Sequence, residues 1–240
     1  MSEWAMKRFW TEAGVEPAEG GHRVVLDGRK VKTPAKAELI LPTEGLAEAV
    51  AAEWAAQDTA VDPLSMPCTR TANSAIDRVA PQRAEVAAML AAYGDSDLLC
   101  YRAEGPEELV ARQAEAWDPA LDWAETTLGA RLEPRTGIMH DAQAEPALAA
   151  LAARVHQFGP FHLAAFHDLV GLTGSLVLGF AAAANWRGAD EIWALSRLDE
   201  TWQAEQWGED EEAAEEAEKK RGDFNHAKRF FDLAGPSGVI

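Results

Sequence analysis

The stretch DSDLLCYRAEGPEELVARQAEAWDPALDWA, residues 95–124, carries the main information about the fold of this chain. Pro106 can open a helix, because its missing N–H would have no partner in the first turn anyway. After it, five side chains recur every three or four residues and predict one buried helix face: Leu109, Val110, Gln113, Trp117 and Leu121. We expect Trp117 and Trp123 to pack in a core between two helices.

The triplet Trp117-Asp118-Pro119 allows two interpretations of this helix. A proline inside a helix removes a hydrogen bond, so Pro119 would break or kink it. Alternatively, Asp118 is an N-cap and Pro119 is the first residue of a second helix. Tyr101 and Arg102 precede the triplet without any recognisable catalytic set. The whole stretch therefore favours packing and recognition over a chemical reaction.

The residues before it predict a small sheet covered by a helix. Short strand-like runs at 23–26, 29–32 and 38–41 are separated by Asp27-Gly28, a strong hairpin signal, and by Thr33-Pro34. A functional loop is the competing interpretation of Asp27, Gly28 and Arg29. Thr43 offers an N-cap for a helix whose buried face is formed by Leu46, Val50 and Trp54.

Two proline-containing pairs, Asp62-Pro63 and Met66-Pro67, predict a hinge after this helix. Beyond the hinge the pattern is helical almost throughout, for example from Pro81 to Tyr93, where Gly94 would end the helix in a left-handed cap. We therefore expect an α+β protein, with a β-rich α+β domain over residues 1–66 and a mainly helical domain over residues 67–240.

Residues 169–186 carry no charge over about eighteen positions, which is at the lower limit for a membrane span. We reject a span, because glycines dilute the hydrophobicity and no Lys or Arg cluster anchors either end. The four-residue spacing of Gly171, Ser175 and Gly179 instead predicts one central buried helix that a neighbour can approach closely. A partly exposed groove is the alternative.

The composition excludes several classes of function. With 22 Lys+Arg against 40 Asp+Glu, the net charge of -18 disfavours nucleic acid and anionic membranes as partners. Cys68 and Cys100 form no metal-binding spacing, so we expect buried thiols in a reducing compartment. His156, His162 and His167 resemble a ligand cluster, but the five-residue separation places His162 and His167 on different helix faces. No phosphate-binding or dinucleotide motif occurs. We expect no cofactor, no metal and no nucleotide.

A series of short motifs, in order along most of the chain, resembles the Atp12 family of F1-ATPase assembly chaperones. The matching segments are Lys7–Trp10, Leu26–Arg29, Lys32–Pro34, Glu53-Trp54, Asp97–Arg102, Gln113, Trp117–Pro119, Ser196–Glu200 and Gln206–Gly208. The resemblance implies a non-enzymatic chaperone that binds the free F1 α subunit and shields its interface until the β subunit displaces it. An unrecognised hydrolase that uses acidic residues and histidines, and a purely structural interaction module, are the alternatives.

The resemblance also suggests which residues matter. It implies a role for an acidic residue near Ser196–Glu200, which we place on Glu200, with Asp199 as the nearest alternative. The predicted partner-binding set lies on one helix across residues 188–208 and consists of Asp199, Glu200, Glu205 and Trp207. The structural motif residues are Asp27, Gly28, Arg29, Trp54, Tyr101, Trp117, Asp118 and Pro119. A surface ion pair with a nearby arginine is the alternative role of Glu200.

Two expectations concern the ends of the chain. Residues 1–14 resemble neither a signal peptide nor a transit peptide, so we expect a bacterial cytoplasmic protein, with a mature mitochondrial matrix form as the alternative. The acidic run at 209–216 precedes Lys219-Lys220-Arg221, an order that suits a helix dipole. Its polar character predicts a protruding or frayed helix.

Overall fold

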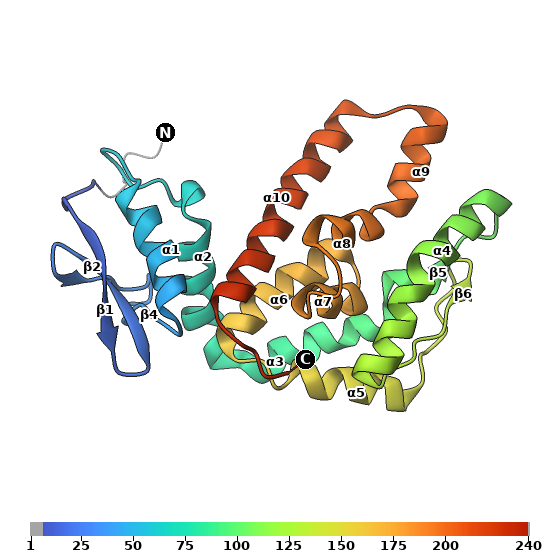
Figure 1. Cartoon of the computed structure of the whole chain (residues 1–240), viewed down its shortest axis with the longest axis horizontal. Coiled ribbons are helices and arrows are strands. Elements are labelled where there is room, and N and C mark those ends of the chain that lie inside the picture. The colour runs from blue at the N-terminus through green and yellow to red at the C-terminus, as the bar shows by residue number, and fades with distance from the viewer. Residues whose placement is uncertain (1–6, 240) are drawn as a thin grey trace. The chain divides into compact units, whose positions relative to one another are not determined.

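A computed structural model describes residues 7–239, and its elements give an α+β fold, as the sequence predicts (Figure 1). The chain divides into two compact units. The first comprises Met1–Arg83, Gly159–Ala165 and Arg229–Ser237, and the second comprises Ala84–Phe158, Phe166–Lys228 and Gly238–Ile240. The division after residue 66 stays a prediction.

The sheet of the first unit has β2 (Gly21–Leu26) at its centre. The strand β1 (Ala13–Ala18) pairs with β2 in antiparallel register, and β3 (Arg29–Lys30) and β4 (Ile40–Leu41) also pair with it. Asp27 and Gly28 form the predicted two-residue hairpin, with φ of 48° and 75°. Such a turn needs positive φ at both positions, which glycine and aspartate tolerate. The sequence analysis did not predict β1.

The carboxylate of Asp27 explains the hairpin without any functional role. Its oxygens accept hydrogen bonds from the backbone N–H groups of Thr11 at 3.0 Å and Glu12 at 2.9 Å. The hydrogen bond from Glu12, and to a smaller extent that from Thr11, lowers the pKa of Asp27 below its ordinary value. The turn residue therefore joins the hairpin to the segment that leads into β1, which supports the structural interpretation of this loop.

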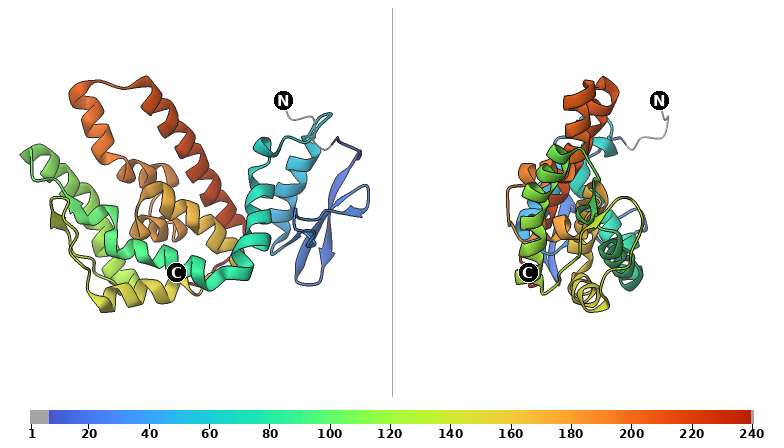
Figure 2. Two further views of the ribbon diagram at one scale, coloured as in Figure 1. Left: turned by 180° about the vertical axis from the view of Figure 1, so that it is seen from behind. Right: turned by 90° about the vertical axis from the view of Figure 1, so that its right-hand side faces the viewer.

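The helix α1 (Glu44–Ala55) begins at the predicted N-cap, because the Thr43 hydroxyl accepts a hydrogen bond from Leu46 N at 3.2 Å. Leu46, Val50 and Trp54 are all buried, as predicted. Figures 1 and 2 show α1 between the sheet and α2 (Pro67–Ser74). The short helical turns Pro63–Ser65, Ala75–Val79 and Ala80–Gln82 complete this part of the chain.

The remaining part of the chain is mainly helical and contains one short parallel strand pair. Its longer helices are α3 (Arg83–Ala91), α4 (Glu107–Trp123), α5 (Glu145–Val155), α6 (Pro160–Thr173), α7 (Leu176–Ala183), α8 (Ala189–Ser196), α9 (Leu198–Trp207) and α10 (Glu211–Leu233). Its short elements are Ala92–Ser96, Leu98–Cys100, Ala124–Leu128, β5 (Tyr101–Arg102) and β6 (Arg135–Thr136). The helices α6 and α10 contribute residues to both units.

The helix α4 is continuous through Pro119, so a break at this triplet and a second helix that begins there are both wrong, while a kink stays a prediction. Trp117, Ala120 and Leu121 are fully buried around the proline. Their burial offsets the one backbone hydrogen bond that proline cannot make. Asp118 is not an N-cap; it forms an ion pair with Arg102 at 2.8 Å.

The prediction of one central helix over residues 169–186 is also wrong, because one helix, α6, ends at Thr173 and a second helix, α7, begins at Leu176. Gly174 has a left-handed backbone, with φ of 68°, and Ser175 caps α7 by accepting a hydrogen bond from Leu178 N at 2.9 Å. The close approach predicted from small residues does occur at Gly179, where a Cβ atom would lie 2.6 Å from Val170 Cγ2. Every residue of Leu176–Ala182 is buried.

Two further features in and after α3 differ from the prediction. Gly94 has no left-handed backbone; it lies in the turn Ala92–Ser96, where an added Cβ would approach Leu148, Leu151 and Leu176 to 3.3 Å. Close packing therefore favours a glycine at this position. The spacing that predicts a helix from Pro81 to Tyr93 places Met89 on its buried face, but Met89 is 48 % exposed.

The predicted helix over residues 188–208 is interrupted at Arg197, which separates α8 from α9. Ile192, Leu195 and Leu198 are buried as expected, whereas Gln206 is exposed. The acidic run that follows is helical from Glu211 onward. It belongs to α10, where the Asp210 carboxylate accepts hydrogen bonds from Glu212 N and Ala213 N.

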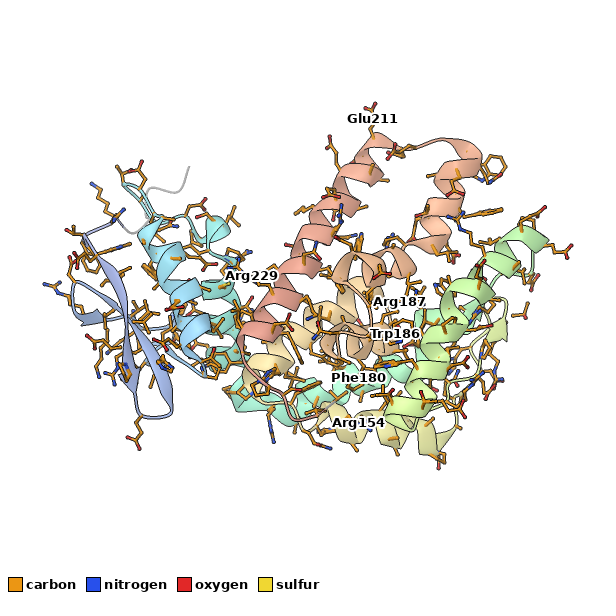
Figure 3. All side chains as sticks on the ribbon, viewed as in Figure 1. Arg154, Phe180, Trp186, Arg187, Glu211 and Arg229 are labelled. Carbon is orange, nitrogen blue, oxygen red and sulfur yellow. The ribbon has the colours of Figure 1, made fainter. Side chains whose placement is uncertain are left out.

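Three phenylalanines form part of the core of the second unit. Phe180, labelled in Figure 3, lies 4.9 Å from Phe166 and 6.1 Å from Phe158, measured between ring centroids. On the same unit, the Arg187 guanidinium lies over the Trp186 ring at 4.3 Å. Among the described residues, no helix is both long and apolar enough to cross a membrane.

Candidate protein-binding groove

A groove of about 550 Å³ in the second unit is the strongest candidate for a functional site. It lies between α4, α9 and the segment around Ile138, and its walls are partly apolar and partly acidic. The main lining side chains are Tyr101, Glu104, Leu109, Ile138, Asp199 and Gln203. Such a mixture suits a protein surface better than a small substrate, because apolar contacts and charges alternate across it.

Asp199 is held in the groove by a buried amide. The Gln113 side chain donates from Nε2 to Asp199 Oδ1 at 2.7 Å, and its Oε1 accepts from Ala103 N at 2.8 Å. Gln113 is only 1 % exposed, so this bridge is protected from water. The carboxylate of Asp199 therefore has a fixed position at the wall of the groove.

Arg102, which also lines the groove, joins three elements. Its Nε donates to Leu99 O at 2.7 Å, its terminal nitrogen lies 2.8 Å from Asp118 Oδ1, and its guanidinium lies 5.3 Å from the centre of the Trp117 ring. Trp117 is fully buried and donates from Nε1 to Leu195 O at 2.9 Å. Trp117 and Asp118 thus support the groove from inside, whereas Tyr101 and Arg102 of the same stretch also line it.

Glu205 joins α9 to α4 through a two-point contact with Arg112. The oxygen–nitrogen distances are 2.5 and 2.9 Å, and the Arg112 guanidinium lies 5.8 Å from the Trp202 ring centre. The hydrogen bond from Arg112 lowers the pKa of Glu205, and the same bond raises the pKa of Arg112. Because Glu205 is occupied within the chain, it suits a supporting role better than partner contact.

Glu200 faces a different cavity, of about 310 Å³, which Arg197 and Lys220 also line. It forms an ion pair with Arg197, the surface pair that was the alternative interpretation of this residue. Its side chain nevertheless remains 53 % exposed. Asp199 and Glu200 therefore face two different cavities, although they are adjacent in the sequence.

Several exposed apolar side chains lie on the second unit. Trp207, at the end of α9, is 86 % exposed, and Ile138 and Met139 are 90 % and 80 % exposed. Sequence analysis selected Trp207 but missed Ile138 and Met139, since neither lies in a helical repeat. Their segment before α5 gives no periodic pattern, so only its position beside the groove identifies it.

The other selected residues belong to the first unit. Asp27, Gly28 and Arg29 form its hairpin, and Trp54 is buried on α1. Across residues 7–239, no group of three or more His, Cys, Asp or Glu side chains could hold a metal ion.

The cysteines are buried and unpaired, as predicted. Burial raises the pKa of both the Cys68 and the Cys100 thiol to about 12, so each remains protonated at neutral pH. Thiols of this kind are poor nucleophiles. The candidate functional site of the second unit is therefore the groove, together with the hydrogen bonds of Gln113 beneath it.

The groove combines apolar and acidic side chains, a composition that is typical of protein-binding surfaces. The sequence model of the ATP12 chaperone protein family matches residues 7–125. Among curated relatives, the mitochondrial protein atp12 of Schizosaccharomyces pombe is 27 % identical over 223 residues, which cover 88 % of this chain and 77 % of the relative.

Solved structures extend the similarity to almost the whole chain. The crystal structure of Atp12 from Paracoccus denitrificans is 49 % identical, with a TM-score of 0.94, and the match covers 97 % of this chain and 100 % of that one. A mutant of the same Paracoccus protein, with lysine in place of an aspartate, gives 49 % identity, a TM-score of 0.95, and coverage of 98 % and 100 %. The chain belongs to the ATP12 chaperone family.

Proposed function

We propose that this chain binds the free α subunit of the F1 sector of ATP synthase and shields the surface that the β subunit later covers. Membership of the ATP12 chaperone family supports a chaperone role in ATP synthase assembly. The observation that carries the proposal is the groove beside α9, where Asp199 is fixed next to the apolar side chains of Leu109 and Ile138.

The proposed mechanism is competitive capping. A free subunit exposes an apolar interface that would otherwise aggregate, and a groove with apolar walls can cover part of it. Two carboxylates of α9, Asp199 in the groove and Glu200 in the other cavity, would select basic side chains on the partner and increase the rate of encounter. No step requires nucleotide, metal or another cofactor, so the β subunit displaces the chaperone by mass action alone.

We expect the purified protein to suppress aggregation of isolated F1 α subunit during refolding, without nucleotide or metal. The physical reason is that the groove would cover apolar surface that the subunit otherwise buries against other copies. Light scattering during dilution from denaturant measures the effect. Serum albumin at the same concentration is the control, and equal scattering with both proteins would contradict the proposed function.

We expect Glu200→Lys to weaken capture of the α subunit by about tenfold or more, because a like-charge contact then replaces an attraction at the interface. The fold should tolerate the change within about 0.5 kcal/mol, since the Glu200 side chain is exposed and surface ion pairs contribute little. Co-purification with α subunit measures capture, and thermal melting by circular dichroism reports the fold.

The two acidic neighbours can be separated by a second substitution. Asp199→Asn removes the charge but keeps an oxygen that can accept the hydrogen bond from Gln113, so it tests charge without opening the network. Glu215→Lys, an exposed reversal on α10, is the matched control. Normal capture by both Glu200→Lys and Asp199→Asn would remove α9 from the recognition surface.

The organisms in which the relatives occur support a cellular location for this chain. A bacterial relative gives the higher identity, which supports a bacterial cytoplasmic setting, and the fission yeast relative supports the mitochondrial matrix as the alternative. Cell fractionation followed by immunoblotting of the native protein distinguishes these two compartments. Recovery with the membrane pellet after a high-salt wash would contradict both.

A further inference from the structure

The first unit contains a second cavity, of about 610 Å³, between the segment after β3, α1 and α2. Every residue that lines it belongs to Met1–Arg83, so the cavity is complete within this unit. Its walls include the apolar side chains of Trp54, Pro63 and Met66. Trp54 and Met66 are buried, with 9 % and 2 % exposure, which makes this part of the wall firmly packed.

Four cationic side chains also line this cavity: Lys32, Lys36, Arg70 and Arg78. All four are exposed, and within residues 7–239 their charged groups have no hydrogen bond or ion pair. The single carboxylate of the lining, Asp77, is already occupied by Thr33 Oγ1 at 2.7 Å and by Ala35 N at 3.0 Å. The cavity is therefore strongly positive in a chain whose net charge is -18.

Two buried polar atoms of the lining lack partners within the described part of the chain. They are Nε1 of Trp54, which is a hydrogen-bond donor, and Oδ1 of Asn73, which is an acceptor. A buried polar group without a partner costs about 1 to 3 kcal/mol, so a ligand that pairs with both gains stabilisation. A peptide group carries one acceptor and one donor, whereas a fully deprotonated anion such as sulfate supplies only acceptors.

We propose that this cavity binds an acidic peptide segment of a partner protein, with an apolar side chain inserted between acidic residues. The apolar walls accept the anchor, the four cations pair with carboxylates, and Trp54 and Asn73 bind the peptide backbone. The volume is also too large for one inorganic anion to fill. The inference goes beyond the proposed function, because it depends neither on α9 nor on the identity of the F1 partner.

The test is fluorescence anisotropy with the full chain and a labelled, end-blocked peptide of alternating Leu and Glu. We expect saturable binding that Arg70→Glu weakens by about tenfold or more, because the reversal places a carboxylate beside an acidic ligand. Arg29→Glu changes the same charge at an exposed position outside the cavity and should alter the affinity by less than about twofold. If Arg70→Glu melts at a lower temperature, Arg78→Glu replaces it.

A second readout reports the site directly. Binding of the peptide should shift the indole N–H signal of Trp54 in a nitrogen–proton correlation spectrum, because that group gains an acceptor. A peptide of alternating Leu and Lys should cause no shift. Absence of binding, equal binding by Arg70→Glu, or an equal Trp54 shift with inorganic phosphate alone would each overturn the proposal.

Discussion

Replacement of Trp117 by alanine is expected to lower the free energy of unfolding by about 3 to 5 kcal/mol, the usual range for a fully buried tryptophan. Trp117 has no exposed surface, and its indole nitrogen donates to Leu195 O at 2.9 Å. The alanine variant loses this hydrogen bond and leaves a cavity beside the Arg102 guanidinium. Chemical denaturation, followed by circular dichroism, measures the change.

The control for this prediction is Trp207→Ala, because Trp207 is 86 % exposed on the same unit. We expect its free energy of unfolding to remain within about 0.5 kcal/mol of the natural protein. Among variants that remain folded, we expect Trp207→Ala to weaken α-subunit binding more than Trp117→Ala does. An unchanged denaturation midpoint for Trp117→Ala would show that this side chain does not stabilise the core.

The second large effect is a dependence of stability on pH that arises from Asp97. This carboxylate is fully buried and accepts hydrogen bonds from Leu99 N, Ser175 Oγ and Val177 N. Burial raises the pKa of Asp97 from 3.8 to about 6, although the hydrogen bonds partly oppose this rise. The folded state therefore binds a proton more tightly than the unfolded chain does.

The sign of the effect follows from this difference in proton affinity. The contribution of Asp97 to the free energy of unfolding is greatest below its ordinary pKa of 3.8 and is lost as the pH rises to about 6. Two pKa units correspond to about 3 kcal/mol. The measurement is the free energy of unfolding of the natural protein minus that of Asp97→Asn, between about pH 3.8 and pH 6. We expect this difference to fall as the pH rises.

Subtraction of the Asp97→Asn values removes the contributions of the other carboxylates, which are common to both proteins. A second variant, Ser175→Ala, tests the cause. The Ser175 hydroxyl donates to the Asp97 carboxylate at 2.7 Å and stabilises its charged form. Removal of this hydroxyl should therefore raise the pKa of Asp97 further, so that the stability difference is lost at a higher pH. A difference that stays constant with pH would show that Asp97 does not control stability in this way.

Local turn and cap chemistry made part of the fold predictable from the sequence. The hairpin at Asp27-Gly28 and the N-cap at Thr43 were confirmed, because each depends on residues within a few positions along the chain. The family was predictable for a different reason. Its motifs are spread over most of the chain, and their order is preserved whatever their contacts are.

The candidate groove was only partly predictable. The sequence selected Asp199 and Tyr101 as members of separate motifs, but it gave no sign that both line one groove with Ile138. It also placed Asp199 and Glu200 in one role, whereas the structure directs them into two cavities. Distances between segments far apart in the chain decide such arrangements, and a single sequence contains no measure of those distances.

The helices around Trp117 and Leu176 show most clearly what the sequence by itself determined and what the tertiary structure decided. Apolar periodicity identified helical regions correctly around Trp117 and around Leu176, but not where each helix ends. Pro119 is tolerated because its neighbours are buried against other helices, and the helix break at Gly174 is stabilised by a distant residue. Asp97 accepts hydrogen bonds from Ser175 and Val177, at the N-terminus of α7. Local propensity thus determined the type of each element and the family of the chain, while long-range packing and hydrogen bonding decided where the helices end and which side chains meet.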